Sequence, residues 1–561
     1  MKCSRTTYAL AFILILAFIL RFWQLDLKLL HHDEAIHSWF CYEFLTRGVW
    51  QYDPSYHGPF LYYVTTGIFA LIGPSDFAAR LLPSLFGFAI IPLVYAVYRI
   101  GYISKNQMLV AALLIAISPD MVYFSRFLRH DIFMLFFTML LLVAILYYFE
   151  RGQTRFAVLA AVAAAGALCC KEEMPIIIII FAVFFAFSLW KGRFTLPLQW
   201  KADLMLFVIL VVAIMSVFYS AFFNHVDTLV GQNFSIATQG VYFEANTTGW
   251  YNAINHWTAM HNQQRLGGPM YYYIPLFLLY ELPIFILALV GTVQFMTAGL
   301  HPVLFFKKVK NWLRERHFAL SVNETVAVSL QQLRDGKEVN GKFEWFFRFC
   351  IVWMIGTMAL YAFVGEKVPW LIIAQLLPMI FVATYRLNWQ KTAFALAGCF
   401  FLIIMTWHVA FVPVDINEPI VQVQNSEDMR EVMGLMDNTS LVVIASQHYW
   451  PLPWYYRGDA WNKKIKFYGN ITDVDIITEK DPGVIILHDT ESYPSIPGYT
   501  KKTYKLSYWF SFYDNDKRLA EYYLRRDGKM GSINIDVFTP LPAFAPRPDV
   551  IPLNTLLVNV T

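Results

Sequence analysis

Long apolar segments recur through this chain of 561 residues and constrain its fold more than any other feature. A helix of roughly 20 apolar residues crosses a ~30 Å hydrocarbon core, so each such segment is a candidate membrane span. With 57% hydrophobic and 15% charged residues, the composition excludes a soluble globular fold. The candidate spans are residues 8–24, 83–100, 107–123, 131–149, 156–170, 174–190, 204–222, 271–296, 346–364, 369–385 and 393–412. The sequence therefore predicts a polytopic α-helical membrane protein with about eleven transmembrane helices.

The placement of basic residues supports this topology. If the N-terminus is cytoplasmic, every inner loop carries Lys or Arg, as the positive-inside bias requires. These residues are Arg99, Lys105, Arg151, Arg155, Lys191, Arg193, Lys201, Lys307, Lys308, Lys310, Arg314, Arg316, Arg386 and Lys391. The apolar run 60–73 is too short to span, and counting it would reverse these loops, so we expect a helix lying in the interface. The first segment lacks a small-residue cleavage site, which favours a retained anchor in a multi-pass plasma-membrane protein.

A different kind of sequence follows residue 413. Leu441–Ala445 and Val484–Leu487 are short apolar runs bounded by turn residues, as in buried strands, and Asp516–Arg526 has helical spacing. An odd number of spans after a cytoplasmic N-terminus places this region outside the cell. We therefore expect a transmembrane module over residues 1–413 and an extracytoplasmic α/β domain over residues 414–561.

Four charged clusters fall at helix ends on the outer face in this topology. They are His31–Glu34, Ser125–Asp131, Lys171–Glu173 and Gly365–Lys367, and Arg80 joins them just before the second span. Positive charge on the outer face opposes the topological bias. Ionisable residues gathered at one membrane face indicate a functional site.

These clusters fit an enzyme that acts on a lipid phosphate. Asp33 or Glu34 could accept a proton from an acceptor hydroxyl. Cations already in place would stabilise a departing phosphate, and the candidates are Arg126, Arg129, Lys171 and Lys367. Asp131 and Glu172 could orient these cations or the sugar hydroxyls. The alternative interpretation is that each cluster only forms ion pairs across a helix end.

A metal site is a weaker hypothesis. His31, His32, Asp33 and His37 lie together in the sequence, but no fourth ligand is specified. We therefore predict no resident metal, while a divalent metal requirement stays open. The net charge of +4 is too small to indicate nucleic acid as a partner.

Six short motifs occur in a fixed order along the first three quarters of the chain. They are His32-Asp33-Glu34, Tyr56-His57-Gly58-Pro59-Phe60, Arg80-Leu81-Leu82-Pro83, Ser125-Arg126 with Asp131, Lys171-Glu172, and Gly365-Glu366-Lys367 followed by Pro369-Trp370. In this order they resemble the GT-C superfamily of integral-membrane glycosyltransferases, which includes protein O-mannosyltransferases and lipid A aminoarabinose transferases. Their combination is most similar to the archaeal family named flippase-activity-associated. The resemblance covers about residues 1–415.

The resemblance implies a module of seven helices with an acidic motif in the first outer loop. It implies a polyprenyl- or dolichyl-phosphate-linked sugar donor, inversion at the anomeric carbon, and Asp33 as the general base, with Glu34 and Asp131 beside it. The expected donor-binding residues are Arg80, Arg126, Arg129, Lys171, Glu172, Glu366 and Lys367. His57 and Arg265 would contact the acceptor or form a lid. Where the superfamily usually has His-Pro, this chain has Gly268-Pro269, so it lacks that histidine.

Three functions compete at this point. The first is a glycosyltransferase acting on a lipid, glycan or protein acceptor, with no certain cofactor. The second is a flippase for lipid-linked oligosaccharides, or its accessory protein, in cell-surface glycan assembly. A flippase needs a polar path across the bilayer, whereas the spans here hold few charges, which favours the enzyme. The third is a scaffold with a decayed site, which the intact Asp33 opposes.

Overall fold

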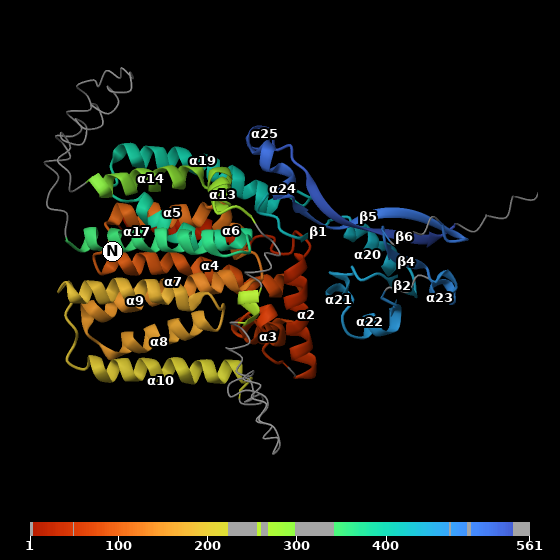
Figure 1. The fold of residues 1–561 in the computed structure, drawn as a ribbon, viewed down its shortest axis with the longest axis horizontal. Helices are drawn as coiled ribbons and strands as arrows, with labels where there is room; N and C mark the ends of the chain where they lie inside the picture. Colours follow the sequence, from red (N-terminus) through yellow and green to blue (C-terminus); the bar gives the residue numbers. More distant parts are fainter. Residues whose placement is uncertain are drawn as a thin grey trace, which may run out of the picture. The chain divides into compact units, whose positions relative to one another are not determined.

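The computed structural model describes residues 4–48, 50–222, 255–259, 268–297, 341–469, 473–490 and 495–541 (Figure 1). Its contacts divide the chain into two compact units. The helical unit comprises Met1–Val423 and Trp509–Met530, and the sheet unit comprises Gln424–Tyr508 and Gly531–Thr561. The helical unit thus continues beyond the expected boundary at residue 413 and includes a later segment of the chain.

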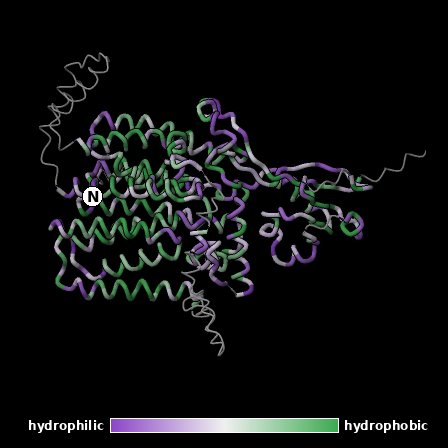
Figure 2. The backbone as a smooth tube through the Cα atoms, in the orientation of Figure 1, coloured by the Kyte–Doolittle hydropathy of each residue, from purple (hydrophilic) through white to green (hydrophobic). Residues whose placement is uncertain are grey.

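The helical unit is a bundle of apolar helices whose ends and loops carry the hydrophilic residues (Figure 2). Each of the eleven predicted spans coincides with a helix or with two consecutive helices. The elements are α1 Arg5–Phe22, α2 His32–Arg47, η1 Pro54–Tyr56, α3 Phe60–Ile72, α4 Asp76–Arg99, α5 Lys105–Ile117, α6 Pro119–Ser125, α7 His130–Arg151, α8 Thr154–Leu168, α9 Met174–Trp190, α10 Trp200–Tyr219, α13 Tyr273–Tyr280, α14 Leu282–Thr297, α17 Gly341–Phe363, η2 Pro369–Leu371, α18 Ile372–Ala383, α19 Trp389–Phe411, α24 Phe512–Asn515, η3 Asp516–Arg518 and α25 Leu519–Arg525.

The chain is a multi-pass membrane protein, although its helices differ in length. Among the described residues, six helices are long and apolar enough to cross a bilayer, and two bent pairs raise this number to eight. The six are α1, α4, α7, α10, α17 and α19. The other predicted spans correspond to α8, α9 and the η2–α18 segment, which are shorter apolar helices. The number eleven therefore stays a prediction.

Two predicted spans are broken rather than continuous. The axis bends by 58° between α5 and α6 and by 114° between α13 and α14. Pro119 begins α6, where its missing N–H breaks the hydrogen-bond pattern that would continue α5. The hydroxyl of Ser118 caps the new helix by accepting from the N–H of Met121. Glu281 ends α13, and its Oε1 accepts from Ser118 Oγ at 2.5 Å and from the N–H of Asp120 at 3.1 Å. The two breaks therefore face each other through one buried carboxyl group.

The first loop between spans contains α2 and α3. Residues 60–73 form the expected short apolar helix, α3, which buries Phe60, Leu61 and Phe69 and packs against α2 and α4. Leu71 and Ile72 at its end are exposed. Its position in the membrane interface stays a prediction.

The sheet unit is a mixed α/β structure, as the short apolar runs predicted. Its elements, two of which extend slightly past the unit boundary, are β1 Gln424–Asn425, α20 Met429–Asp437, β2 Val442–Ala445, α21 Leu452–Tyr455, α22 Asp459–Lys464, β3 Ile465–Phe467, α23 Val474–Thr478, β4 Val484–His488, β5 Tyr499–Phe510 and β6 Met530–Pro540. The strand order is β1-β5-β6-β4-β2-β3. Strand β2 is parallel to both β3 and β4, while β4 is antiparallel to β6. Val443, Ile485 and Phe538 form part of its core.

Candidate active site

The acidic motif of the first loop begins helix α2. The ring Nδ1 of His31 accepts from the N–H of Asp33 at 3.1 Å, and Glu34 Oε2 accepts from the N–H of His31 at 2.9 Å. This reciprocal capping box satisfies donors that the first turn would otherwise leave unpaired. Both carboxylates also lie in the first turn, where the helix dipole favours negative charge. The motif thus starts a helix and sets the directions of its two acidic side chains.

Glu34 points into the bundle and is fully buried. Its carboxylate accepts from Arg80 Nε at 2.9 Å, from Arg80 Nη2 at 2.6 Å and from the N–H of Leu128 at 2.8 Å. Arg80 also donates to three backbone carbonyls, those of Leu25, Lys28 and Leu29. Burial would raise the pKa of Glu34, but Arg80 and these hydrogen bonds hold it below its usual value. Arg80 thus joins helix α4 both to the first turn of α2 and to the loop after α1.

Asp33 points the other way, and its side chain is 31% exposed. Its Oδ2 accepts from Arg129 Nη1. Burial would raise the pKa of Asp33, but Arg129 and His31 lower it far below its ordinary value, so the group is a carboxylate. The guanidinium of Arg129 also lies 3.7 Å from the centre of the Trp370 ring, which supports its charge by a cation–π contact.

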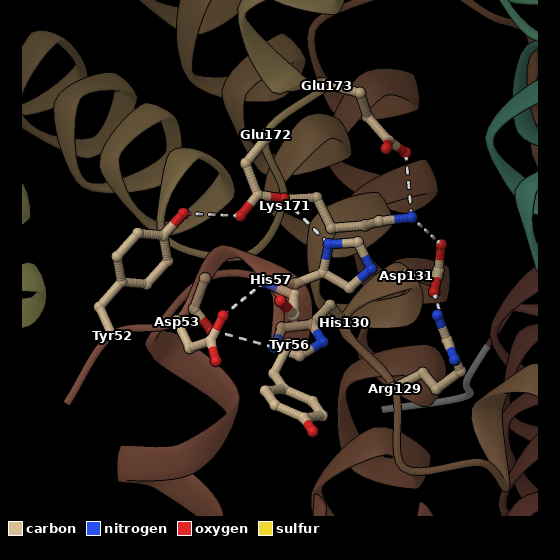
Figure 3. A network of polar contacts seen from close by, with 12 residues as sticks. Tyr52, Asp53, Tyr56, His57, Arg129, His130, Asp131, Lys171, Glu172 and Glu173 are labelled. Atoms are coloured by element: carbon tan, nitrogen blue, oxygen red, sulfur yellow. Dashed lines mark hydrogen bonds and ion pairs between the residues drawn. The ribbon is translucent and has the colours of Figure 1, made fainter. Parts of the chain in front are cut away.

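A row of alternating charges continues from this pair, and we call it the charge ladder: Asp33, Arg129, Asp131, Lys171 and Glu173. Figure 3 shows its members from Arg129 to Glu173. Arg129 Nε lies 3.5 Å from Asp131 Oδ2, and Lys171 Nζ lies 2.8 Å from Asp131 Oδ1 and 3.2 Å from Glu173 Oε1. Burial would lower the pKa of Lys171, but Asp131 and Glu173 raise it above its usual value. Each buried charge therefore has an opposite neighbour, as low-polarity surroundings require.

A second polar group lies beside the ladder and joins the first loop to the segment between α8 and α9 (Figure 3). His57 Nδ1 lies 2.9 Å from Glu172 Oε2, and the hydroxyl of Tyr52 donates to Glu172 Oε1 at 3.1 Å. Burial raises the pKa of Glu172 to about 7. Burial also lowers the pKa of His57 well below its usual value. The pair can therefore hold one proton near neutral pH.

The backbone fixes His57 in an unusual conformation. Its backbone φ is 64°, in a region that residues other than glycine rarely adopt, so tertiary contacts must hold His57 in this conformation. The N–H groups of Gly58 and Phe60 donate to the carbonyls of Cys170 and Cys169 at 3.1 and 3.0 Å. A Cβ on Gly58 would lie 2.2 Å from the Cys169 oxygen, so only glycine permits this approach. The ring of His57 stacks on Trp257 with centroids 4.7 Å apart.

Other expected site residues are placed differently. Arg126 donates to the carbonyls of Leu20, Arg21, Trp23 and Gln24, so it closes the end of α1. Lys367 Nζ donates to the carbonyls of Tyr361, Ala362 and Val364, at the end of α17. Glu366 is near enough to His57 to oppose the effect of burial on its pKa. Arg265 lies outside the described residues.

The structure adds residues that the sequence alone did not indicate. Glu173 ends the charge ladder and accepts from the hydroxyl of Tyr361 at 3.1 Å. The only signal for it was its place in the Lys-Glu-Glu cluster. Tyr52 and Trp257 had no signal beyond being aromatic. Trp370 belongs to the motif that begins at Gly365, but nothing in the sequence indicated its contact with Arg129.

The described residues contain no group of three or more His, Cys, Asp or Glu side chains arranged to hold a metal ion. His31 uses Nδ1 on the backbone of α2, and its Nε2 contacts the carbonyl of Gln422. His37 Nδ1 lies 2.8 Å from the hydroxyl of Tyr62. The side chains of the hypothetical histidine site therefore have other partners.

Comparisons with known proteins agree with this architecture. A family model described as dolichyl-phosphate-mannose-protein mannosyltransferase matches residues 56–218. No curated protein sequence matches the chain. The structure is similar to ArnT from Cupriavidus metallidurans bound to undecaprenyl phosphate, with a TM-score of 0.54, 13% identity, and coverage of 95% of this chain and 98% of that one.

Two further solved structures are similar at lower scores. The Archaeoglobus fulgidus oligosaccharyltransferase in the apo form has a TM-score of 0.47 and 13% identity, covering 86% of this chain and 70% of that one. The S. cerevisiae Pmt1-Pmt2 complex bound to the sugar donor has a TM-score of 0.35 and 18% identity, covering 40% and 35%. The agreement with ArnT over nearly the whole length of both chains establishes that this protein has the fold of the GT-C membrane glycosyltransferases.

Proposed function

We propose that the protein is a glycosyltransferase that moves a sugar from a polyprenyl- or dolichyl-phosphate donor to a lipid, glycan or protein acceptor at the outer membrane face. The observation that carries this proposal is the charge ladder. A half-buried carboxylate, Asp33, stands at its end and contacts Arg129, and Lys171 lies beyond Asp131. Both cations suit a phosphate. The GT-C fold and the matched mannosyltransferase family model support the same donor class.

In this mechanism Asp33 is the general base. It takes the proton of the acceptor hydroxyl while the acceptor oxygen bonds to the anomeric carbon. The bond from that carbon to the phosphate oxygen breaks, and the polyprenyl phosphate leaves with the electron pair. Attack opposite the leaving group inverts the anomeric centre. Glu34 does not share this role, because it is fully buried and already bound to Arg80.

Arg129 and Lys171 supply the positive charge for the donor phosphate. Arg129 holds Asp33 with Nη1, and a guanidinium has five N–H donors, so it can bind a phosphate and a carboxylate together. Lys171 adds a point charge on the other side of Asp131. The positions of Arg126 and Lys367 on backbone carbonyls give them a structural role in this proposal.

The protein's orientation is part of the proposal. The cytoplasmic N-terminus, the plasma-membrane location and the outer position of residues 414–561 follow from the positive-inside bias. In this orientation the charge ladder lies at the outer face of the membrane, where a lipid-linked sugar that has been moved to the outer leaflet would reach it. His57 and Glu172 lie beside the ladder and would face the acceptor.

The alternative is a flippase or a flippase-associated protein. A test separates the two in proteoliposomes that contain the full chain and dolichyl-phosphate mannose labelled in the sugar, with octyl mannoside as one acceptor and a Ser/Thr peptide as another. A transferase yields labelled acceptor and free dolichyl phosphate. A flippase moves intact donor between leaflets, which periodate oxidation of outer-leaflet sugar detects. Transfer that is abolished by Asp33→Asn supports the proposal, whereas donor movement without transfer would refute it.

A further inference from the structure

One edge of the sheet unit collects side chains that the proposed transfer reaction does not use. Strands β2, β3 and β4 are parallel, with Ala445 paired to Leu487 and Ile444 to Phe467, so their carboxyl ends lie at the same edge. The segments that leave this edge are 446–450 after β2, 468–469 after β3 and 489–490 after β4. In sheets with parallel strands, ligands bind beyond the carboxyl ends of the strands.

Four aromatic side chains gather there, and we call them the aromatic patch: Tyr449, Trp450, Trp461 and Phe467. The ring of Tyr449 lies 4.8 Å from that of Phe467, 6.0 Å from that of Trp450 and 6.3 Å from that of Trp461. Phe467 is 44% exposed, and the other three are only partly buried. Large rings that stay accessible to water at a rigid edge indicate a binding surface.

Polar groups lie along the same edge. The rings of His448 and His488 are 4.6 Å apart, and His488 Nδ1 lies 2.6 Å from Thr490 Oγ1. Asn534 Nδ2 donates to Asp489 Oδ2 at 3.1 Å, while the Asp489 side chain remains 29% exposed. Imidazole, carboxylate and hydroxyl groups can all donate to or accept from hydroxyl groups.

The buried core of the sheet unit and hydrogen bonds within the loop after β2 fix the position of this edge. Val443 and Ala445 of β2 and Ile485 and Leu487 of β4 lie in the buried core of the unit. The hydroxyl of Ser446 accepts from the N–H of His448 at 3.0 Å and donates to its carbonyl at 3.1 Å, which fixes the loop after β2. A preformed surface of this kind loses little conformational entropy when it binds a ligand.

We propose that this edge is a carbohydrate-binding site, in which the aromatic patch stacks on the C–H face of a pyranose and His448, His488 and Asp489 bind its hydroxyl groups. A sugar ring has one apolar face and a rim of hydroxyls, and the edge offers the same two kinds of surface side by side. A membrane surface would instead require Lys and Arg beside the aromatic side chains. Three lysines lie near the patch in the sequence, but Lys463 donates to Asp459 and Lys464 to the carbonyl of Asp437. Lys466 directly precedes Phe467 on β3, so its side chain points to the opposite face of the sheet. The polar groups that lie along the edge are His, Asp, Asn and Thr.

The site goes beyond the proposed transfer activity, because binding to it needs neither a lipid donor nor Asp33. The test uses the full chain in lipid nanodiscs and fluorescently labelled di- and trisaccharides of mannose, glucose, galactose and N-acetylglucosamine, with fluorescence polarisation as the readout. At least one probe should bind with a Kd below about 10 mM. Phe467→Ala and Trp461→Ala should each weaken that binding about 10-fold or more, and Asp489→Asn about 5-fold.

The matched control is Ile476→Ala, which removes a 41% exposed apolar side chain elsewhere in the same unit and should leave binding unchanged. Asp33→Asn should bind the saccharide normally even where transfer is lost, so failure of the two proposals can be told apart. Absence of binding by the wild-type protein would overturn the site, as would equal binding by the wild type, Phe467→Ala and Trp461→Ala. A concentration-dependent dimer that Phe467→Ala abolishes would also overturn it, because the patch would then bind a second copy of the chain.

Discussion

Arg129 holds Asp33 from 96 residues away in the sequence, and its Nε also faces Asp131. One guanidinium thus joins the first turn of α2 to the first turn of α7. Because Arg129 lowers the basicity of Asp33, a phosphate that competes for the guanidinium would make Asp33 a better proton acceptor. The same contact therefore links the expected binding of donor to the expected activation of the base.

Asp33→Asn should reduce turnover by at least ~10²-fold, because the amide keeps the shape of the side chain but cannot accept a proton. The measurement is kcat for sugar transfer by the purified protein. Asp26→Asn is the matched control, since Asp26 is an exposed aspartate in the same loop and should keep its activity. Wild-type turnover by Asp33→Asn would exclude Asp33 as the base.

Arg129→Gln and Arg126→Gln should have different effects although the residues are three positions apart. Arg129→Gln should raise the KM for the lipid donor about 10-fold or more, and Arg129→Lys should restore part of the loss. Arg126→Gln should leave that KM nearly unchanged. It should lower the free energy of unfolding by ~1–3 kcal/mol, because it leaves backbone carbonyls at the end of α1 without donors. If both variants raised KM equally, the structural role of Arg126 would be wrong.

Removing Glu34 should destabilise the fold rather than affect the chemistry directly. Glu34→Ala leaves the buried Arg80 without its counter-charge, at a cost of about 3–5 kcal/mol. Glu43→Ala on the same helix breaks a pair with Arg47, whose side chain is 73% exposed, and should cost much less because Arg47 remains hydrated. Thermal unfolding in detergent compares the two, and similar losses would contradict the assigned difference.

Glu172 should make stability depend on pH. Its pKa rises from 4.5 to about 7 on folding, because burial disfavours the charged form. The folded state therefore keeps a proton that the unfolded state releases, so stability is highest below pH ~4.5 and falls as the pH rises through 7. The full effect is up to about 3 kcal/mol.

Glu172→Gln should remove this dependence. Buried histidines such as His57 contribute in the opposite direction at low pH, so the quantity to compare is the difference between the wild type and the variant at pH 5 and pH 8. The variant should gain relative stability at pH 8. An equal difference at both pH values would mean that Glu172 titrates normally.

The predicted orientation can be tested by cysteine labelling in intact cells. In a background without native cysteines, an impermeant thiol reagent should label Arg430→Cys and miss Lys310→Cys until the membrane is permeabilised. The side chain of Arg430 is half exposed, so accessibility does not limit the reaction. Labelling of position 310 but not position 430 would reverse the orientation.

The sequence by itself determined the class of fold and the regions of the site. A continuous apolar segment of membrane length crosses the bilayer as a helix, because hydrocarbon offers no hydrogen-bond partners and a helix pairs its backbone N–H and C=O groups internally. The short runs at 441–445 and 484–487 predicted strands for a similar local reason, and both are strands. The charged clusters marked the ends of helices because charge is costly within the bilayer.

Only the tertiary structure decided which charges meet. Asp33 and Glu34 are neighbours in the sequence, yet they point about 100° apart around α2, so one reaches Arg129 and the other Arg80. The rotation of α2 depends on the His31 cap and on packing against α3, which local sequence does not encode. The breaks at Ser118 and Glu281 likewise depend on a contact across 163 residues. Sequence patterns report the environment of each residue, whereas the partners of a buried charge are set by how separate helices pack.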